Sequence, residues 1–308
     1  MRVIDPSFEI QEALDTAPMA ERLEACGRIC YKSEDKITPE SAVPFVQKIA
    51  AHGHNSVLEM AVATFRVNCH PDHVLEFYAC QPKYFITDRI DTGIMITGSI
   101  RAFREIYVKY SDNQVVNDLM VELHKRYPYL FEGVFDPDIA METDTSVGIE
   151  KLSLEEVEDL PSELLARHRY VGVKFIVNRA VTHELVRHRP CSFLQESQRY
   201  CRYSQEQFGN EVTFVKPVFF EEDSNEYQLW QQAMEDTEKL YMKLLETSTA
   251  QAARTVLPNS CKTEIITYCN LEEWRHIFML RTSPAAEPSM REIMIPLEQE
   301  MKKRFAVL

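Results

Sequence analysis

The chain has 308 residues, 45% of them hydrophobic and 27% charged, so it can bury an ample core in one large domain or two small ones. Its formal net charge of −14 argues against a general nucleic-acid-binding protein, because such a protein needs a basic face. No apolar run approaches the roughly 18 residues of a membrane helix, and the N-terminus lacks the apolar core of a signal peptide. Without that signal the eight cysteines suggest reduced thiols, so we expect a cytoplasmic protein that binds neither nucleic acid nor a membrane.

The N-terminal part of the chain alternates between strand and helix patterns. Residues 1–35 predict a short strand followed by a helix. Thr38-Pro39-Glu40 predicts the start of a second helix, with threonine as N-cap and proline as the first helical residue, and Gly53 predicts its end. Residues 61–69 alternate enough to predict a half-buried strand.

The middle of the chain has weaker patterns and carries much of the negative charge. Residues 72–80 and 113–126 favour helices, and residues 93–97 favour a strand. From Glu132 to Glu163 the chain is rich in carboxylates and has Lys151 as its one basic residue. Because this acidic stretch is internal, we interpret it as a solvated insertion.

One cysteine–histidine group in this region suggests a metal. Cys69, His70, His73 and Cys80 have ligand chemistry and lie close together in sequence. Their spacing does not match a standard zinc site, and no second ligand pair follows at the usual distance. We therefore predict no metal.

The C-terminal part is predominantly helical. Residues 175–186 favour an apolar helix, residues 211–215 a strand, and Asn225 to Thr247 a long helix with one apolar side. That side, which we expect to belong to the core, is formed by Trp230, Met234, Thr237, Tyr241 and Leu244. A final helical stripe, interrupted at Pro296, is formed by Met290, Met294, Leu297 and Met301.

The helix predicted from Leu271 to Arg281 places a cation on an apolar face. Leu271, Trp274 and Phe278 define the inward face, and Arg281 continues it at the next helical step. An unpaired cation there would cost several kcal/mol. A carboxylate or a bound anion must therefore lie against Arg281.

The most informative stretch runs from Arg187 to Tyr200 and reads R-H-R-P-C-S-F-L-Q-E-S-Q-R-Y. Its arginines offer rigid forks of donors that match phosphate oxygens. The first basic cluster and the pair Ser197 and Arg199 can address two anions at once. A solvated basic loop, or an ion-pair network with the many carboxylates, is the alternative.

This stretch resembles the signature of the flavin-dependent thymidylate synthases. R-H-R, seven residues and then Ser197 are followed by Arg199 and Tyr200 at the spacing of that family. Further elements resemble the family in the same order: a His-x-Ser element at residues 54–56, an A-R-x-V-L-P element at residues 253–258 and an asparagine at position 270.

The resemblance covers about residues 1–65 and 175–308 and implies an α+β fold, a twisted mixed or antiparallel sheet with flanking helices. It implies one domain over residues 1–308 with an insertion of about 90 residues at about 71–165. The implied reaction is the reductive methylation of dUMP to dTMP by an enzyme that uses FAD, with methylenetetrahydrofolate and NADPH as co-substrates. A homotetramer is the assembly that the resemblance implies.

The resemblance also implies roles for individual residues. Arg281 is the implied catalytic residue, since it contacts the pyrimidine and favours its ionised N3 form. The implied cofactor-binding residues are His54, Ser56, Arg187, His188, Arg189, Gln195, Asn270 and His276. The implied substrate-binding residues are Glu184, Arg187, Gln195, Glu196, Ser197, Gln198, Arg199, Arg254 and Arg281.

Three alternatives stay open. Departures from the family pattern at Gln195, Glu272 and residues 286–293 are compatible with a degenerate nucleotide-binding homologue without redox activity. A methylase of another pyrimidine nucleotide and an RNA-binding module are the other two. Pro190-Cys191 resembles the nucleophile motif of the unrelated flavin-free synthases, but the surrounding residues do not, so we do not assign covalent catalysis to Cys191.

Overall fold

A computed structural model describes residues 1–205 and 208–308. Within them the chain divides into two compact units. The first unit comprises residues 1–11, 27–34 and 172–308, and the second comprises residues 12–26 and 35–171. Each unit is described by itself.

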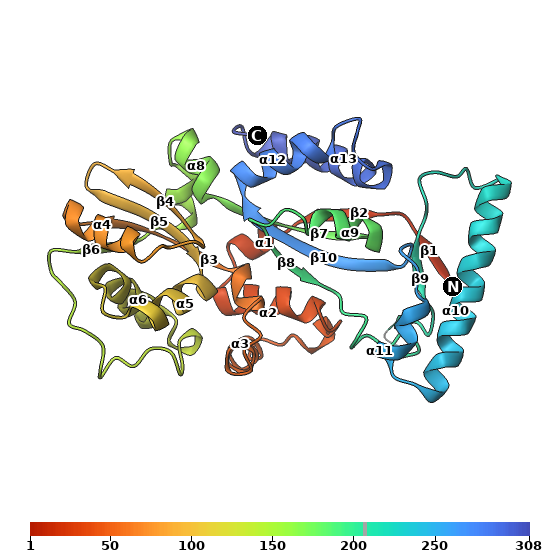
Figure 1. Cartoon of the computed structure of the whole chain (residues 1–308), viewed down its shortest axis with the longest axis horizontal. Helices are drawn as coiled ribbons and strands as arrows, with labels where there is room; N and C mark the ends of the chain where they lie inside the picture. The colour runs from red at the N-terminus through yellow and green to blue at the C-terminus, as the bar shows by residue number, and fades with distance from the viewer. Residues whose placement is uncertain (206–207) are drawn as a thin grey trace. The chain divides into compact units, whose positions relative to one another are not determined.

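The first unit is built on a four-stranded sheet in the order β2-β7-β10-β8 (Figure 1). β2 and β7 pair in antiparallel fashion with Phe8 opposite Phe175, and β8 and β10 pair in the same fashion. A separate parallel pair joins β1 to β9. The strands of this unit are β1 (Arg2–Ile4), β2 (Ser7–Ile10), β7 (Tyr170–Asn178), β8 (Ser192–Gln195), β9 (Thr213–Val215) and β10 (Lys262–Asn270).

Strand β7 corrects the prediction of a helix over residues 175–186. The segment is a strand up to Asn178, where the Asn178 side chain caps the short helix α9. β-Branched and aromatic residues alternate along β7, and its inward side chains, Val173, Phe175 and Val177, are fully buried. Pairing with β2 therefore overrides the apolar run that favoured a helix.

Helices cover this sheet and the β1–β9 pair. Figure 1 shows α12 and α13 side by side along the sheet, and α10 beside β1 and β9. The helices are α9 (Arg179–Leu185), α10 (Asn225–Thr247), α11 (Ala250–Ala253), α12 (Leu271–Arg281) and α13 (Pro288–Arg304). The predicted bounds of α10 and α12 are confirmed.

The predicted apolar stripes of these helices are largely confirmed. Met234 and Tyr241 of α10 are buried, but the stripe continues through Leu245, because Leu244 is exposed. A four-residue step from Tyr241 stays on the buried face, whereas a three-residue step turns away from it here. In α13 the predicted stripe from Met290 to Met301 is fully buried, and the helix continues through Pro296.

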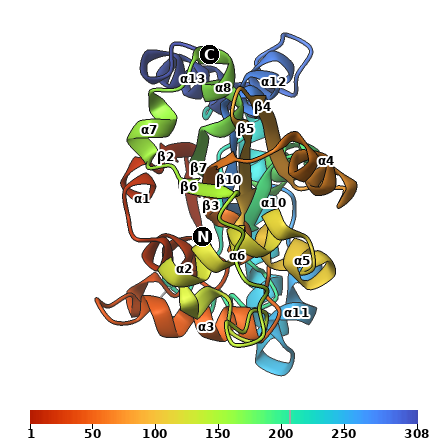
Figure 2. The same cartoon turned by 90° about the vertical axis from the view of Figure 1, so that its left-hand side faces the viewer.

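The second unit contains a four-stranded antiparallel sheet in the order β4-β5-β3-β6. Figure 2 shows α4 and α5 on one side of this sheet and α7 on the other. The strands are β3 (Val62–Asn68), β4 (Phe85–Ile90), β5 (Gly93–Ser99) and β6 (Gly148–Lys151). The helices are α1 (Glu12–Asp15), α2 (Met19–Ile29, whose last residues belong to the first unit), α3 (Ala42–Ala51), α4 (Pro71–Ala79), α5 (Ile100–Tyr110), α6 (Gln114–Arg126), α7 (Leu154–Glu158) and α8 (Ser162–His168).

Most predicted elements of this unit are confirmed within a few residues. The exception is the start of α3, which was predicted at Thr38 and lies at Ala42. The backbone N–H of Thr38 donates to the hydroxyl of Ser41, 2.9 Å away, so the residues before Ala42 form a turn closed by a side chain. Serine and threonine support such local turns as readily as a helix start.

A buried hydrogen-bond chain holds α8 to its sheet. The Thr97 hydroxyl lies 2.8 Å from that of Thr64 and 2.7 Å from Nδ1 of His168, whose Nε2 lies 3.0 Å from a carboxylate oxygen of Asp88. Burial lowers the pKa of His168, although Asp88 opposes the shift. The order Thr-His-Asp is that of a catalytic triad, but Thr97 is fully buried and offers a substrate no access.

The predicted α+β class, with helices flanking mixed and antiparallel sheets, is confirmed. The single domain with an insertion over residues 71–165 stays a prediction. No helix in the described ranges has the length and apolar character needed to cross a membrane.

The core of the first unit can be tested through α12. Trp274 is fully buried and stacks on Phe278, with ring centroids 5.6 Å apart. We expect Trp274→Ala to reduce the free energy of unfolding by about 3–5 kcal/mol, because it removes the ring and leaves a cavity. Met279→Ala on the same helix is the control, since Met279 is 63% exposed and should change stability little. Urea unfolding followed by fluorescence measures both, and equal losses would contradict the assignment of this face as core.

Candidate functional site

The cation predicted on the inward face of α12, Arg281, makes three hydrogen bonds in the structure. We name five residues the Arg281 cluster: Glu184, Arg187, His188, Glu273 and Arg281. Arg281 Nη1 donates to the Glu184 carboxylate at 2.8 Å, and its Nη2 donates to the Glu184 backbone carbonyl at 2.9 Å. Its Nε donates to Nε2 of His188 at 3.0 Å. The prediction that a carboxylate or an anion must lie against Arg281 is thus confirmed by Glu184.

This arrangement sets the tautomer of His188. Because Nε2 accepts a hydrogen bond from Arg281, a neutral His188 carries its proton on Nδ1. Nδ1 lies 3.4 Å from the Glu273 carboxylate, close enough for electrostatic attraction but without hydrogen-bond geometry. His188 is buried, with a 4% exposed side chain, so Arg281 and Glu273 determine the orientation of its ring.

Glu184, on α9, binds two arginines: Arg187 of the signature and Arg281 of α12. Its carboxylate accepts from Arg281 and, at 3.0 and 3.2 Å, from Arg187. Desolvation raises the pKa of Glu184, but the hydrogen bond from Arg281 and the charge of Arg187 outweigh it and leave the pKa below the ordinary 4.5. Glu184 is therefore ionised at neutral pH.

His188, Glu273 and His276 form the one group in the described ranges whose ligand atoms lie close enough together to hold a metal ion, within 4.8 Å of one another. The hydrogen bonding argues against that use. A metal on Nδ1 of His188 would leave the ring proton on Nε2, where it would face the N–H of Arg281 at 3.0 Å. Two donors cannot share that contact, so binding a metal would break the bond between Arg281 and His188.

A second group of charges supports the end of the signature. Lys262 Nζ donates to Glu196 at 2.9 Å and to Glu264 at 2.6 Å, and Lys32 Nζ donates to Glu264 at 2.9 Å. The Tyr203 hydroxyl donates to the other Glu196 oxygen at 2.9 Å. These five residues form the Glu196 network. The Glu196 side chain is 1% exposed and both its oxygens are occupied, so the structure gives it a supporting position.

Next to this network, Ser197 and Arg199 approach the segment that carries Arg254. The Ser197 hydroxyl accepts from the Arg199 backbone N–H at 3.3 Å, and Arg199 Nε donates to Gln251 of α11, also at 3.3 Å. Gln251 precedes Arg254 by one helical turn. Arg199 is thus held against the helical turn that leads to Arg254.

Several predicted ligand donors remain unused. The side chains of Arg189 and Arg254 make no hydrogen bond or ion pair in the ranges that the structure describes. The side-chain nitrogen of Gln198 is buried and also lacks a partner among those residues. Unpaired buried donors are rare in folded proteins and mark places where a ligand is expected.

The remaining signature residues have structural partners. Gln195 Nε2 donates to the hydroxyls of Thr182 and Thr263, each 3.1 Å away, which leaves its carbonyl oxygen available. Asn270 is the N-cap of α12 and accepts from the Glu273 backbone N–H at 2.9 Å. The ring of His276 stands edge-on to that of His188, with centroids 5.9 Å apart, and is exposed.

His54 and Ser56 belong to the second unit. Both are exposed and lie in the turn that leads to residues 57–60, a short 3-10 helix. Their contact with the cofactor stays a prediction.

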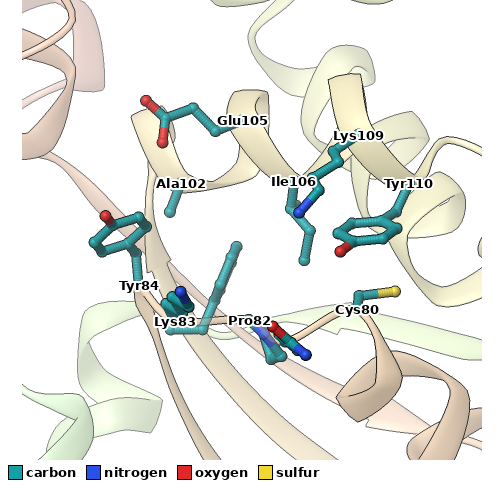
Figure 3. Close-up of a pocket in the computed structure, with 11 residues that line it drawn as sticks. Cys80, Pro82, Lys83, Tyr84, Ala102, Glu105, Ile106, Lys109 and Tyr110 are labelled. Carbon is teal, nitrogen blue, oxygen red and sulfur yellow. The ribbon is translucent and has the colours of Figure 1, made fainter.

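Neither of the two cavities described here includes a predicted site residue, and both lie in the second unit. The first has a volume of about 280 Å³ between α5 and the segment that leads into β4. Figure 3 shows the nitrogen of Lys109 pointing into it, with Tyr84 and Tyr110 on opposite sides. A larger hollow of about 780 Å³ is lined by residues between Tyr107 and Met141.

Sequence reasoning missed some of the residues that build the site. They are Tyr203, Gln251, Lys262, Glu264 and Glu273. The alternation of Lys262 and Glu264 along a strand is a signal, since both side chains then lie on one face. Glu273, three residues after the N-cap asparagine, is typical of a first helical turn and has no further signal.

The sequence matches a known family over well over half of its length. A family model described as thymidylate synthase complementing protein matches residues 14–76 and 161–306. The chain therefore belongs to this family. The resemblance drawn from the signature is confirmed.

Relatives named flavin-dependent thymidylate synthase are similar over part of their length. That of Pyrococcus furiosus is 39% identical over 128 residues, which is 41% of this chain and 52% of the relative. That of Corynebacterium efficiens is 30% identical over 144 residues, 42% of this chain and 55% of the relative. The chain thus spans about half the length of these relatives.

Solved structures show a weaker likeness. A UMP/dUMP methylase PolB from Streptomyces cacaoi, bound with 5-Br dUMP, is 13% identical with a TM-score of 0.43. The comparison covers 100% of this chain and 94% of that chain. A TM-score of this size carries no argument about the site.

Glu264 allows the Glu196 network to be tested. Burial raises the pKa of Glu264, but Lys262 and Lys32 outweigh it and leave the pKa below the ordinary 4.5. Glu264→Gln should lower the free energy of unfolding at pH 7 by about 2–4 kcal/mol, because two ammonium groups lose a shared counter-charge while each keeps another carboxylate.

Because the folded-state pKa is depressed, this contribution is present above pH 4.5 and is lost as the pH falls below it. Glu34→Gln is the matched control, since Glu34 contacts the same Lys32 at 2.9 Å but is far more exposed. Urea unfolding of the wild-type protein and both variants, from roughly one unit below the ordinary glutamate pKa to roughly four units above it, measures the change in the free energy of unfolding. If the loss of unfolding free energy caused by Glu264→Gln were the same at every pH in that range, this charge assignment would be ruled out.

Proposed function

We propose that this protein is an FAD-dependent thymidylate synthase that converts dUMP to dTMP. Membership of the family and the names of its relatives support the reaction class. The donor set of the signature supports the ligands. Methylenetetrahydrofolate as the carbon donor, NADPH as the reductant, a homotetrameric assembly and a cytoplasmic location belong to the same proposal and rest on the family alone.

The observation that carries the proposal is the unused hydrogen-bonding capacity of Arg281. A guanidinium group has five N–H donors, and Arg281 uses three of them in hydrogen bonds to Glu184 and His188. Two donors remain on a side chain that is 15% exposed and whose position is fixed by three hydrogen bonds. They match the carbonyl oxygens of a pyrimidine ring.

The charge of Arg281 also has a chemical consequence. A fixed cation beside the pyrimidine stabilises negative charge on its N3 and adjoining oxygens, and the effect is strong where water is excluded. Arg281 therefore favours the ionised pyrimidine, whose ring carbon is the more nucleophilic. We assign it the catalytic role.

The donors around the Arg281 cluster fit a flavin dinucleotide. Arg187 and Arg189 are exposed and offer N–H donors to phosphate oxygens. One carboxylate oxygen of Glu273 is buried without a hydrogen-bond partner among the described residues, and it can accept from an N–H or hydroxyl of the cofactor. Arg187, His188, Arg189 and Asn270 would hold FAD, and the cofactor contact of His54 and Ser56 in the second unit rests on the family alone. When bound, FAD supplies hydride transfer, which no protein side chain can perform.

The donors around Ser197 fit the phosphate of the nucleotide. Ser197, Arg199 and Arg254 supply a hydroxyl and two guanidinium groups, and Gln198 adds a buried unpaired amide. Charge-assisted hydrogen bonds of this kind are worth about 1.5–3 kcal/mol each. Gln195 keeps its carbonyl oxygen for the base. Glu196 holds this segment in place through Tyr203 and Lys262.

The first test is an absorbance spectrum of the purified full-length protein before and after FAD and then dUMP are added. We expect flavin bands near about 370 and 450 nm that co-elute with the protein and shift when the nucleotide binds. Protein that retains no flavin with excess FAD, yet still binds dUMP, would instead support the degenerate nucleotide-binding alternative. A flavoprotein that methylates UMP but not dUMP would support another pyrimidine substrate.

Arg281→Ala tests the assigned catalytic residue. We expect kcat/KM for dUMP to fall at least about 10³-fold, because the variant loses the cation that stabilises the ionised ring. Arg275→Ala is the matched control on the same helix, since Arg275 is exposed and, among the described residues, donates to the backbone carbonyl of Val307 alone, at 3.0 Å. Formation of dTMP under saturating FAD measures both variants. Similar rates for the two would contradict the role of Arg281.

A further inference from the structure

Two cysteines lie opposite each other where the signature turn enters the sheet. Ser192 of β8 pairs with Tyr268 of β10 in antiparallel register. The same register, continued by one residue, sets Cys191 against Cys269. Cys191 follows Arg187-His188-Arg189 of the signature, and Cys269 directly precedes Asn270, the N-cap of α12.

The register determines what kind of pair they form. Glu196 donates its backbone N–H to the Glu264 carbonyl at 2.8 Å, so Glu196 and Glu264 are a hydrogen-bonded pair. Hydrogen-bonded and non-hydrogen-bonded pairs alternate along an antiparallel ladder. Counting five residues from Glu196 to Cys191 therefore places Cys191 and Cys269 in a non-hydrogen-bonded pair.

Non-hydrogen-bonded pairs suit a disulfide. Their Cα atoms lie about 4.5 Å apart and their side chains are closer than in the alternate pairs, and disulfides span Cα separations of about 4.4–6.8 Å. The Cys191 thiol is among the groups that raise the pKa of Cys269, as expected for two side chains that face each other across this pair. A bond between the two sulfur atoms would thus require little backbone movement.

The two thiols differ in access. Cys269 is 1% exposed and Cys191 is 9% exposed, beside the exposed Arg189 and Pro190. Burial raises the pKa of Cys269 well above its ordinary value. An external oxidant therefore meets Cys191 first, and Cys269 serves as the resolving thiol.

We propose that Cys191 and Cys269 form a reversible disulfide by exchange with a small-molecule disulfide. The Cys191 thiolate attacks one sulfur of that molecule, forms a mixed disulfide and releases one thiol. Cys269 then loses its proton, attacks the Cys191 sulfur and releases the second thiol. Two protein thiols are oxidised to one disulfide, and the small disulfide is reduced to two thiols.

The link would act on the Arg281 cluster. The Cys191 backbone N–H donates to the His188 carbonyl at 3.1 Å, so Cys191 ends the turn that carries His188. Tying Cys191 to Cys269 would join this turn covalently to the start of α12, which carries Glu273 and Arg281. In a cytosolic protein such a link is formed and broken with the redox state.

The test uses the full-length protein equilibrated with oxidised and reduced glutathione at stepped ratios. We expect the intact mass to fall by about 2 Da as two thiols become one disulfide, and a peptide map to join the peptides of Cys191 and Cys269. Reduction with dithiothreitol should restore the original mass. Cys26→Ser is the matched control and should show the same loss of mass, because Cys26 lies on α2 outside this pair.

Variants and hydrogen exchange distinguish the linkage from simple oxidation. Cys191→Ser should abolish the disulfide, whereas Cys269→Ser should trap a glutathione adduct on Cys191, about 305 Da heavier. In the wild-type protein, oxidation should slow amide exchange over residues 187–191 and leave residues 225–247 of α10 unchanged. An unchanged mass at the most oxidising ratio, an adduct on wild-type Cys191 that is never resolved, or a disulfide between other cysteines would each overturn the proposal. None of these readouts depends on flavin or dUMP, so the proposed function can fail while this inference holds.

Discussion

The guanidinium of Arg281 between Glu184 and His188 is the contact on which the site depends. It joins the last turn of α12 to the end of α9, and it fixes the tautomer of the signature histidine. Glu184 is ionised because two arginines surround it, and Arg281 can remain partly buried because Glu184 is ionised. The site is thus assembled from opposite charges whose mutual attraction offsets the cost of their desolvation.

Carboxylates within the proposed site balance its cations. A site for two anionic ligands needs several arginines, and arginines close together repel one another unless carboxylates separate them. Glu184 does this for Arg187 and Arg281, while Glu196 and Glu264 balance the lysines beneath the second half of the signature. Arg189 and Arg254, which have no side-chain partner among the described residues, and the two remaining donors of Arg281 are then available to a ligand.

Local sequence patterns predicted the helices and strands well where a single periodicity of apolar residues dominated. The bounds of α10 and α12 followed from three- and four-residue spacing, and Arg281 was recognised as a cation that needed a partner. The helix predicted over residues 175–186 was wrong in its first part, because an apolar run of that length suits a buried strand as well as a helix. Its place in the sheet, between β2 and β10, decides between the two.

By itself the sequence determined the family and the need for a counter-charge at Arg281, and it predicts anion binding by residues 187–200. Residue types and spacing carry that information directly. The tertiary structure decided that Glu184 supplies the counter-charge, that Glu196 and Glu264 face two lysines, and that Cys191 faces Cys269. These partners are up to 232 residues apart in the sequence, and sheet register and helix packing alone bring such groups together.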